Sequence, residues 1–487
     1  MSDASLSARA LQNLLGDWRG GLPGAAYLAL ADRVRLLVLD GRVSVDTRLP
    51  AERELAERLG VSRTTVTAAY RHLREQGYLR SLRGSGSVAR IPGAPAVLPV
   101  PPAATHLDLS KAAPPALPWL AEVARDAADE LPAHLGDSGF DPIGMPALRQ
   151  AIADRYGVRG LPTRSEQIMV TIGAQHAIGL LARVLVGRGD RAVIEAPTYP
   201  HAYEALQLAG ARLVPVPVAP HDPRFDGGVP PHGDEVEALE RALARTNPST
   251  AYLMPDFQNP TGRSLDADAR RRLLDVAARQ GTVVIADETT AELDIDRDRA
   301  PLPLAAYGPP GTAVLIGSLG KTVWGGVRIG WIRAEPPLIR RLLAARLPGD
   351  LGTPILEQLI ATRLIGRMDE ILELRRSELR AGRDRVETLI AELFPDWRVP
   401  HVDGGIAVWI GLGAPISSQL ALAARAQGLL IAAGPRFGID GAFERFLRLP
   451  ICQPVAETEA AVHALRRAWE SMPGVAAADA GLLPAVV

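Results

Sequence analysis

The stretch Ile316-Gly317-Ser318-Leu319-Gly320-Lys321-Thr322 contains one of only two lysines in a chain of 487 residues, against 52 arginines. Arginine has replaced lysine almost wherever a surface charge suffices, so a lysine that is kept indicates a need for an amine. A buried lysine can lose its proton and form a Schiff base with an aldehyde, whereas arginine stays protonated and is a poor nucleophile. We therefore expect Lys321 to act as an amine. The alternative, a plain surface lysine, suits Lys111, which lies beside a Pro/Ala-rich stretch.

The composition is that of a globular protein with more than one domain. The chain is long enough for a large core, and 47% of its residues are hydrophobic, which is ordinary. No apolar run reaches the roughly 18 residues that a membrane span needs, and the N-terminus has no signal-peptide pattern. Cys452 is the only cysteine, so we expect no intramolecular disulfide and no cysteine/histidine metal site. These features predict a cytoplasmic protein without a membrane partner.

Charge and proline content divide the chain. Residues 1–90 carry 14 arginines and 9 acidic residues, or +5, and the remainder sums to −6. A basic segment on a slightly acidic body suggests a polyanion partner for that segment. Residues 91–105, IPGAPAVLPVPPAAT, contain five prolines and indicate an extended linker. We predict a small module at 20–90, this linker, a body at 106–472 and a poorly ordered tail at 473–487.

The N-terminal module has the pattern of a winged helix-turn-helix. Apolar residues at helical spacing predict three helices, the last of which has Ser62 as a good N-cap. Two short β patterns around the flexible tip Arg83-Gly84-Ser85-Gly86 predict the wing. The expected helices are 25–39, 50–60 and 62–76, and the expected wing strands are 78–82 and 87–90.

The last of these helices is the expected DNA reader. It begins Ser62-Arg63-Thr64-Thr65-Val66-Thr67, which puts an arginine and hydroxyls at the helix N-terminus, where base edges and phosphates are reached in the major groove. Arg53, one helix earlier, is expected to point toward the same groove. The alternative is a small helical domain with a solvated, charged face. The side chains expected to be buried are Val66, Ala69, Tyr70 and Leu73.

The body alternates short apolar strands with helices. This alternation predicts an α/β fold with a mainly parallel sheet that helices cover on both faces. After a long helical region at about 352–392, shorter strands at 406–410 and 446–449 predict a smaller C-terminal α+β subdomain. The expected strands of the main sheet are 167–172, 191–195, 212–216, 250–254, 282–286 and 313–317.

The surroundings of Lys321 match the needs of pyridoxal 5′-phosphate, which takes an amine for its aldehyde, donors for its phosphate and a carboxylate for its ring nitrogen. Lys321 supplies the amine. Ser318 lies three residues before it and Arg328 seven after it, and both can bind the phosphate. Gly173-Ala174-Gln175 follows a strand and opens a helix, whose N–H groups and dipole form an anion site. Alone, this tripeptide is a weak signal.

Three further side chains at strand ends suit the ring of this cofactor. Asp287 ends the strand 283–286 and can keep the ring nitrogen protonated; the alternative is an aspartate that caps a turn. Asn259, in Gln258-Asn259-Pro260-Thr261-Gly262, can donate to the phenolic oxygen. Tyr199 lies just past another strand and can stack on the ring, although a core tyrosine is the alternative. Open α/β sheets bind ligands at such strand ends.

Three motifs in the N-terminal module match a single family. They are Leu-Pro-Ala-Glu-Arg-Glu-Leu-Ala, then Gly-Val-Ser-Arg-Thr-Thr-Val, then Gly-Tyr-Leu and Gly-Ser-Gly, all within residues 25–90. With them the module closely resembles the GntR family of bacterial repressors, which implies that it binds duplex operator DNA. The DNA contacts that the resemblance implies are Arg53, Ser62, Arg63, Thr64, Thr65 and the wing glycines Gly84 and Gly86.

The body also has a family pattern, carried by the order and spacing of the groups around Lys321. The pattern includes the segment 139–149, GFDPIGMPALR, and Arg448 in Phe446-Leu447-Arg448-Leu449. Over residues 107–470 the body thereby resembles the fold type I aminotransferases. The resemblance implies that Arg448 binds the α-carboxylate of an amino acid, a role that suits a guanidinium. It also implies a homodimer, because active sites of this fold are built at a subunit interface.

Module, linker and body together resemble the MocR-type transcriptional regulators, with one departure from the aminotransferase pattern. In aminotransferases a tyrosine two or three residues after the ring-nitrogen aspartate bonds the phenolic oxygen, but Asp287 is followed by Glu288-Thr289-Thr290-Ala291. Thr289 can substitute in part, or Asn259 can act alone. The departure argues against efficient transamination and leaves cofactor binding intact.

We therefore expect a pyridoxal phosphate-dependent transcription regulator with at most weak transamination. Its body would sense a small amine or amino acid, or pyridoxal phosphate itself. One alternative is a working aminotransferase with a DNA-binding appendage. Another is a repressor whose body is a cofactor-free dimerisation module, and the retained Lys321, Asp287, Asn259 and Arg328 argue against it.

Overall fold

The computed structural model describes residues 5–16, 18, 25–39, 42–43, 47–82, 86–90, 106–136, 138–218, 233–297, 299–439 and 441–472. The predicted linker at 91–105, the wing tip with Gly84 and the predicted tail at 473–487 lie outside these residues. Contacts between residues divide the chain into two compact units. The first combines residues 1–107, 412–447 and 467–487, and the second combines residues 108–411 and 448–466.

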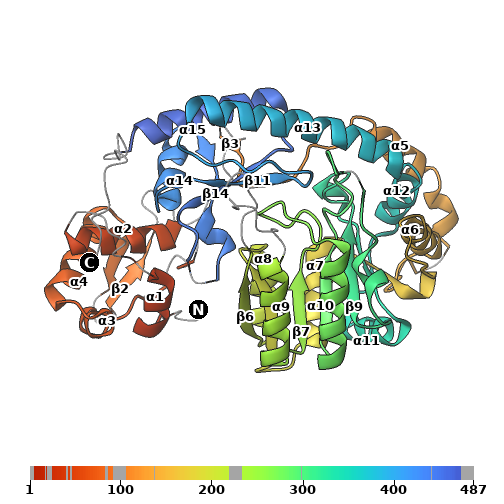
Figure 1. Ribbon diagram of the computed structural model, residues 1–487, viewed down its shortest axis with the longest axis horizontal. Helices are drawn as coiled ribbons and strands as arrows, with labels where there is room; N and C mark the ends of the chain where they lie inside the picture. The colour runs from red at the N-terminus through yellow and green to blue at the C-terminus, as the bar shows by residue number, and fades with distance from the viewer. Residues whose placement is uncertain are drawn as a thin grey trace. The chain divides into compact units, whose positions relative to one another are not determined.

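The first unit contains the predicted winged helix-turn-helix (Figure 1). Its helices bury a common apolar core that includes Leu30, Leu55 and Tyr70. The wing strands pair antiparallel, with Leu79 opposite Ala89. The sequence pattern missed the first helix, which Ser7 caps by accepting from the Ala10 N–H at 3.2 Å. The elements are α1 (Ala8–Leu15), α2 (Ala26–Leu39), α3 (Glu52–Leu59), α4 (Arg63–Glu75), β1 (Leu79–Leu82) and β2 (Gly86–Ala89), followed near the C-terminus by α14 (Ser417–Ala426), β12 (Leu429–Leu430) and β13 (Ala432–Ala433).

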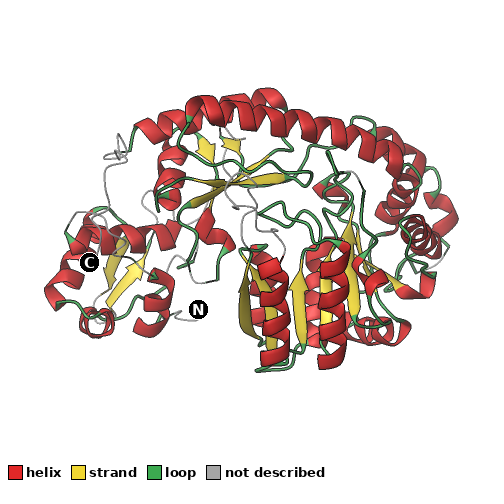
Figure 2. Ribbon diagram, in the orientation of Figure 1, coloured by secondary structure: helices red, strands yellow, loops and turns green. Residues whose placement is uncertain are grey.

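The second unit is built on a seven-stranded sheet in the order β4-β10-β9-β8-β7-β5-β6. Figure 2 draws strands in yellow and helices in red. From β6 to β9 the neighbouring strands pair parallel, whereas β10 is antiparallel to both β4 and β9. The predicted α/β class with a mainly parallel sheet is confirmed. The strands are β4 (Ile168–Thr171), β5 (Arg191–Ala196), β6 (Arg212–Pro217), β7 (Thr250–Leu253), β8 (Val283–Asp287), β9 (Ala313–Ser318) and β10 (Gly330–Arg333).

Helices cover this sheet, as the burial of its strands requires. Every residue of β4 and β7 is buried, which a strand achieves only when both faces of the sheet are covered. Helices α9 and α10 run side by side along the strands (Figure 1). Not all helices of the second unit lie on this sheet, and α15 ends in the first unit. The helices of the second unit are α5 (Leu120–Ala128), α6 (Pro146–Val158), α7 (Gly173–Leu185), α8 (Pro200–Leu208), α9 (Gly233–Thr246), α10 (Ala267–Gln280), α11 (Pro336–Arg346), α12 (Ile355–Ile365), α13 (Met368–Leu393) and α15 (Val455–Glu470).

The predicted C-terminal strands are also present. Strand β11 (Ala407–Gly411) lies beside β14 (Phe446–Pro450) in a small sheet. A further short strand, β3 (Leu107–Asp108), follows the linker. The long helical region predicted at about 352–392 consists of two helices, α12 and α13, which Gly366 and Arg367 separate.

Candidate cofactor site and DNA-binding face

The residues predicted to bind the cofactor ring and its phosphate lie at one edge of the main sheet. Strands β4, β5, β7, β8 and β9 all end at this edge, where open α/β sheets bind ligands. Asp287 is the last residue of β8, and Ser318 is the last residue of β9. Gly173, Tyr199 and Asn259 follow the ends of β4, β5 and β7.

Lys321 has the surroundings of a reactive amine. Its Nζ donates to the carbonyl oxygen of Ala112 at 2.6 Å. Burial lowers the pKa of the Lys321 amine below its usual value, and the charge of Arg448 lowers it further, against opposing effects from Cys452 and Asp287. A lowered pKa leaves more of the amine neutral at a given pH, and only the neutral amine attacks an aldehyde.

The N-terminus of α7 and the Arg328 guanidinium form an anion cradle. Gly173 opens the helix at φ +73°, and Arg328 Nη2 donates to the carbonyl oxygen of Ile172 at 3.1 Å. A Cβ atom on Gly173 would lie 3.0 Å from the same Nη2. A Cβ atom on Gly330 would lie 2.6 Å from the carbonyl carbon of Gly173. Glycine at both positions therefore lets the guanidinium approach the helix N–H groups, which bind phosphates.

Ser318 and Gln175 contribute to the same cradle in different ways. Ser318 Oγ donates to the carbonyl oxygen of Ile329 at 3.0 Å and accepts from the Gly320 N–H at 3.0 Å, so it fixes the turn that leads to Lys321. The exposed side chain of Gln175 donates to the His201 carbonyl oxygen at 3.3 Å. Only the backbone N–H groups of Gln175 and Ala174, in the first turn of α7, are therefore candidates to bind the phosphate. Their roles as phosphate ligands stay predictions.

Asp287 is buried, and both of its carboxylate oxygens accept hydrogen bonds. Tyr252 Oη donates to Oδ2 at 2.6 Å, and the Thr289 N–H donates to Oδ1 at 3.0 Å. Only 3% of the Asp287 surface is exposed. Donors to both oxygens stabilise the ionised carboxylate, which is the form that pairs with a protonated ring nitrogen. Sequence reasoning missed Tyr252; the signal for it was a tyrosine within the otherwise apolar run Ala251-Tyr252-Leu253.

Asn259 and Tyr199 are the other two side chains that are predicted to contact the cofactor ring. Asn259 is buried, and its carboxamide oxygen has no hydrogen-bond partner among the residues that the structure describes. Buried polar atoms are nearly always paired in proteins, so this oxygen, which can only accept, indicates a donor on a ligand beside it. A bond to the phenolic oxygen would use the NH2 group of the same amide. The Tyr199 ring is half-buried. Burial, and then the charge of Asp287, raise the pKa of its hydroxyl to about 12.

A buried charge cluster holds the loop that carries Asn259, and sequence reasoning missed this cluster. Arg270 and Arg297 donate to Asp256 Oδ1 at 2.7 and 2.6 Å. Thr290 Oγ1 donates to the Asp256 carbonyl oxygen at 3.0 Å. Burial raises the pKa of Asp256, but the two arginines outweigh burial and bring that pKa below its usual value. The cluster ties the loop after β7 to α10 and to the turn after Asp287.

Arg448, the predicted carboxylate clamp, is buried in β14. Its guanidinium donates to the carbonyl oxygen of Ser110. Burial lowers the pKa of Arg448 to about 10, and Cys452 and Tyr199 act in the opposite direction. The charge of Arg448 lowers the pKa of both Lys321 and Tyr199, so Arg448 lies near these two side chains. Its role toward a carboxylate stays a prediction.

The arrangement fits pyridoxal 5′-phosphate. The chain offers an amine, a phosphate cradle, a buried carboxylate that accepts two hydrogen bonds, and an unpaired amide oxygen at one sheet edge. When bound, this cofactor supplies an electron-withdrawing ring. The chain itself would bind the phosphate through Arg328 and α7, orient the ring through Asp287 and Asn259, and accept or return a proton at Lys321 Nζ.

The residues predicted to contact DNA lie at the start of α4 and near it, and their roles toward DNA stay predictions. Ser62 Oγ accepts from the Thr65 N–H at 3.1 Å and caps α4. Arg63 and Thr64 are exposed in the first turn. The Arg53 side chain is 81% exposed and pairs with Glu57. Gly86, at φ +88°, begins β2. The predicted buried face of Val66, Ala69, Tyr70 and Leu73 is confirmed.

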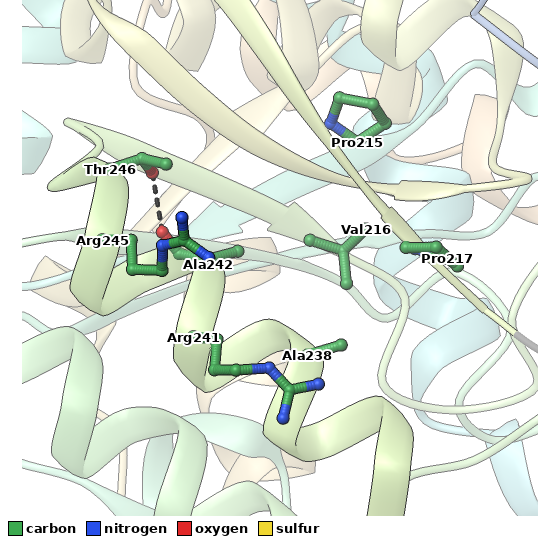
Figure 3. A pocket seen from close by; sticks show the side chains of 8 residues that line it. All are labelled: Pro215, Val216, Pro217, Ala238, Arg241, Ala242, Arg245 and Thr246. Atoms are coloured by element: carbon green, nitrogen blue, oxygen red, sulfur yellow. Dashed lines mark hydrogen bonds between the residues drawn. The ribbon is translucent and has the colours of Figure 1, made fainter.

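A surface hollow of about 370 Å³ lies elsewhere, between β6 and α9 (Figure 3). Thr246 Oγ1 there donates to the Ala242 carbonyl oxygen at 2.7 Å, an ordinary helix contact. Because none of the cofactor residues lines the hollow, we assign it no role. The residues that line it are Pro215, Val216, Pro217, Ala238, Arg241, Ala242, Arg245 and Thr246.

The described residues show neither a metal cluster nor a membrane span. Among them, no group of three or more His, Cys, Asp and Glu side chains is arranged to hold a metal ion. None of the helices in the described part of the chain is long and apolar enough to cross a membrane.

Comparisons with known proteins identify the family of each part of the chain. Residues 110–465 match the family model of class I and II aminotransferases, and residues 26–88 match that of the gntR family of bacterial regulatory proteins. The pyridoxine biosynthesis transcriptional regulator PdxR of Corynebacterium glutamicum is 30% identical over 404 residues, which are 79% of this chain and 83% of that protein. The probable rhizopine catabolism regulatory protein MocR of Rhizobium meliloti is 31% identical, over 63% of this chain and 65% of that protein.

A solved structure gives the same result for the body. The α-aminoadipate aminotransferase LysN of Thermus thermophilus, in complex with N-(5′-phosphopyridoxyl)-L-leucine, superposes with a TM-score of 0.67 at 28% identity. The match covers 75% of this chain and 92% of that one.

The chain therefore belongs to the class I and II aminotransferase family and carries a gntR-type DNA-binding domain at its N-terminus. This combination defines a MocR-type transcriptional regulator, as the sequence motifs predicted. Pyridoxal 5′-phosphate, the cofactor of the family, is its cofactor.

Proposed function

We propose that this regulator uses pyridoxal phosphate on Lys321 as a sensor that sets its affinity for operator DNA. The observation that carries the proposal is the setting of Lys321, an amine with a lowered pKa at the sheet edge that also holds the α7 cradle and Asp287. Perturbed pKa values of this kind cluster at functional sites. The sensed molecule is a small amine or amino acid, or pyridoxal phosphate itself.

Each residue of the proposed site has a role toward the phosphate, the ring or the effector. The α7 start at Gly173, Ala174 and Gln175 binds the phosphate together with Ser318 and Arg328. The remaining side chains hold the ring and the effector. Asp287 pairs with the ring nitrogen, Asn259 and Thr289 serve the phenolic oxygen, Tyr199 stacks on the ring, and Arg448 binds an effector carboxylate.

Sensing is favoured over turnover by the residues directly after Asp287. Residues 288–291 are Glu-Thr-Thr-Ala, so the phenolic oxygen lacks the tyrosine that aminotransferases place there. The N–H of Thr289 is committed to Asp287. Attachment of an amine needs only the aldehyde, whereas completed transamination also needs well-placed proton transfers. Multiple rapid turnovers with an amino acid and a keto acid would instead support the working aminotransferase.

A contact inside the first unit offers a route from effector to DNA. Arg33 of α2 donates to Glu444 and, at 3.0 Å, to the Gly441 carbonyl oxygen. Glu444 also accepts from the N–H of Ser418, at the start of α14, at 3.0 Å. Glu444 lies four residues before Arg448 in the sequence, so movement of β14 on effector binding would reach the DNA-binding helices through this ion pair.

A homodimer is part of the proposal. One winged helix reads a short half-site, and two linked readers give useful specificity. Phe140 and Leu351 are 66% and 49% exposed. The backbone segments that carry them lie close together, because a Cβ atom on Gly352, next to Leu351, would lie 2.5 Å from the carbonyl oxygen of Asp141, next to Phe140. Contiguous exposed apolar patches mark interaction surfaces, and we propose that these two side chains belong to the dimer interface. Light scattering should show a dimer, and Phe140→Glu with Leu351→Glu should weaken it.

Borohydride trapping tests the assignment of Lys321. The purified protein with pyridoxal phosphate is reduced and digested, and the cofactor should be found on the peptide that contains Lys321. Lys111, exposed and paired with Asp108, is the matched control, and Lys111→Ala should change nothing. A cofactor that is still trapped in Lys321→Ala would overturn the assignment.

A further inference from the structure

Tyr252 is buried in β7, beside the strand that carries Asp287. Strands β7 and β8 pair parallel, with Tyr252 opposite Ile285. None of the Tyr252 surface is exposed. Its hydroxyl donates to Asp287 Oδ2 at 2.6 Å, while Oδ1 is held by the Thr289 N–H at 3.0 Å. The carboxylate is therefore held at both of its oxygens, at Oδ1 by a backbone N–H and at Oδ2 by a side-chain hydroxyl.

Tyr252 is the hydrogen-bond donor of this pair, and Asp287 is the acceptor. Burial, and then the charge of Asp287, raise the pKa of the Tyr252 hydroxyl well above its usual value. Tyr252 therefore keeps its proton and is the donor, and Asp287 Oδ2 is the acceptor. A short O–H···O⁻ bond is among the stronger hydrogen bonds in proteins. A buried carboxylate without such donors takes up a proton instead.

A purely structural role for the tyrosine explains less of this geometry. Phenylalanine would fill the same volume in an apolar strand without the cost of burying a hydroxyl. The hydroxyl meets the one carboxylate at the sheet edge that the ring nitrogen of the cofactor needs.

We propose that Tyr252 is a positioning residue that holds the Asp287 carboxylate at Oδ2 and aims it at the ring nitrogen of pyridoxal phosphate. The inference rests on the proposed role of Asp287. Without the Tyr252 hydroxyl, Oδ2 would be unpaired in a buried site, and the proton shared with the ring nitrogen would move toward Asp287. Tyr252 acts only through Asp287, so its removal should have no effect once Asp287 is neutral.

The test is a double-mutant cycle on the full-length protein, reconstituted with pyridoxal phosphate labelled with ¹⁵N in the ring. The four proteins are the wild type, Tyr252→Phe, Asp287→Asn and the double variant. The ¹⁵N chemical shift reports protonation of the ring nitrogen, which a merely structural substitution would not move. Tyr156→Phe is the matched control, because Tyr156 is also buried and accepts from Trp331 Nε1 at 3.2 Å, outside the site.

The expected result is a ¹⁵N shift toward the unprotonated ring in Tyr252→Phe, and none in Tyr156→Phe. Cofactor affinity should fall roughly tenfold to a hundredfold, as for loss of a hydrogen bond to a charged group. In the Asp287→Asn background, Tyr252→Phe should add no further shift. An unchanged shift in Tyr252→Phe, or an equal further shift in the double variant, would overturn the inference.

Failure of the Asp287 role can be distinguished from failure of the Tyr252 role. If the wild-type ring nitrogen is unprotonated, or Asp287→Asn leaves its shift unchanged, the proposed role of Asp287 fails, whatever Tyr252 does. If Tyr252→Phe does not fold, 3-fluorotyrosine at position 252 decides, because it keeps the shape and donates more strongly. It should move the ¹⁵N shift measurably from that of the wild type, and an unmoved shift would overturn the role of Tyr252.

Discussion

At the residue scale, the site depends on how burial and neighbouring charge change ordinary side chains. Lys321 has a pKa lowered by burial and by Arg448, so its amine is available where an exposed lysine would be protonated. Asp287 carries two donors in a buried place. The properties of each group depend on atoms that other parts of the fold supply, and on this ground we propose the sheet edge as the site of the chemistry.

The lowered pKa of Lys321 predicts the pH dependence of cofactor attachment. The attachment rate should rise with the neutral fraction of the amine and reach half of its maximum below the value of about 10.4 that an unperturbed lysine would give. Arg448→Gln removes a charge that lowers this pKa, so its profile should move to higher pH. Arg376→Gln, in a partly exposed pair with Glu373 on α13, is the control. Stopped-flow absorbance measures the rate, and a wild-type midpoint at or above about 10.4 would contradict the account.

Single residues of the site were predictable where they end an apolar strand. Lys321, Asp287 and Asn259 each follow or close such a strand, and the structure brings them to one edge. The bond between Tyr252 and Asp287 was not predictable, because the two residues are 35 positions apart and meet only when β7 pairs with β8.

At the element scale, β10 is a strand that the local sequence pattern does not predict. The run Gly330–Arg333 is short and comes soon after Arg328, so nothing local distinguishes it from a loop. It becomes a strand because β4 and β9 both pair with it. The six predicted strands of the main sheet, in contrast, were apolar runs between helices. Strand β10 also places Gly330 against Gly173, at the anion cradle.

Gly330→Ala should weaken cofactor binding. Its Cβ would lie 2.6 Å from the carbonyl carbon of Gly173 and 2.8 Å from the Ala174 nitrogen, so the start of α7 must shift. Loss of even one good phosphate hydrogen bond corresponds to roughly a tenfold rise in the dissociation constant. Gly179→Ala, on the same helix with nothing within 4 Å, is the matched control. Equal affinities of the two variants in a fluorescence titration would refute the cradle.

The Asp256 cluster predicts a stability change that depends on pH. Asp256→Asn leaves the buried Arg270 without its carboxylate, whereas Arg297 keeps its pair with Asp294. The substitution should cost about 3–5 kcal/mol. The folded pKa of Asp256 is lowered, so this contribution is complete above the unfolded value of about 3.9 and is lost as the pH falls through the folded pKa. Asp268→Asn, in an exposed pair with Arg271, should cost about 0–1 kcal/mol. Urea unfolding at several pH values measures both, and equal costs would contradict the prediction.

At the scale of the whole molecule, segments far apart in the sequence combine within each compact unit. The winged helix-turn-helix and the α/β class were predictable from motifs and alternation, which are local signals. The ion pair between Arg33 and Glu444, inside the first unit, spans 411 positions, and no local pattern indicates it. The division of the chain by its predicted linker concerns residues outside those that the structure describes.

Operator recognition should depend on Arg63. If Arg63 contacts a base edge, Arg63→Ala should cost about 1–3 kcal/mol of operator affinity and blur sequence preference. Arg241→Ala removes an exposed arginine from α9 and is the control for total charge. Gel shifts on operator and scrambled DNA measure both, and equal operator affinities for Arg63→Ala and the wild type would exclude this role.

Charge reversal tests the route through Arg33 and Glu444. Arg33→Glu should reduce the effect of the cofactor on operator affinity, because it breaks the ion pair. Arg33→Glu combined with Glu444→Arg should restore part of that effect. Fluorescence anisotropy with labelled operator measures the effect in each variant. If the cofactor changes operator affinity as much in Arg33→Glu as in the wild type, the effect does not pass through this ion pair.

The measurement that tests the central claim most directly is operator affinity with and without pyridoxal phosphate, in the wild type and in Lys321→Ala. A ligand shifts DNA binding only by its differential affinity for the two arrangements, typically about 1–3 kcal/mol. We predict a change in operator dissociation constant of roughly 5-fold to 150-fold in the wild type and none in Lys321→Ala. Identical operator affinity of the wild type with cofactor, without it, and with amino-acid effectors would contradict the account.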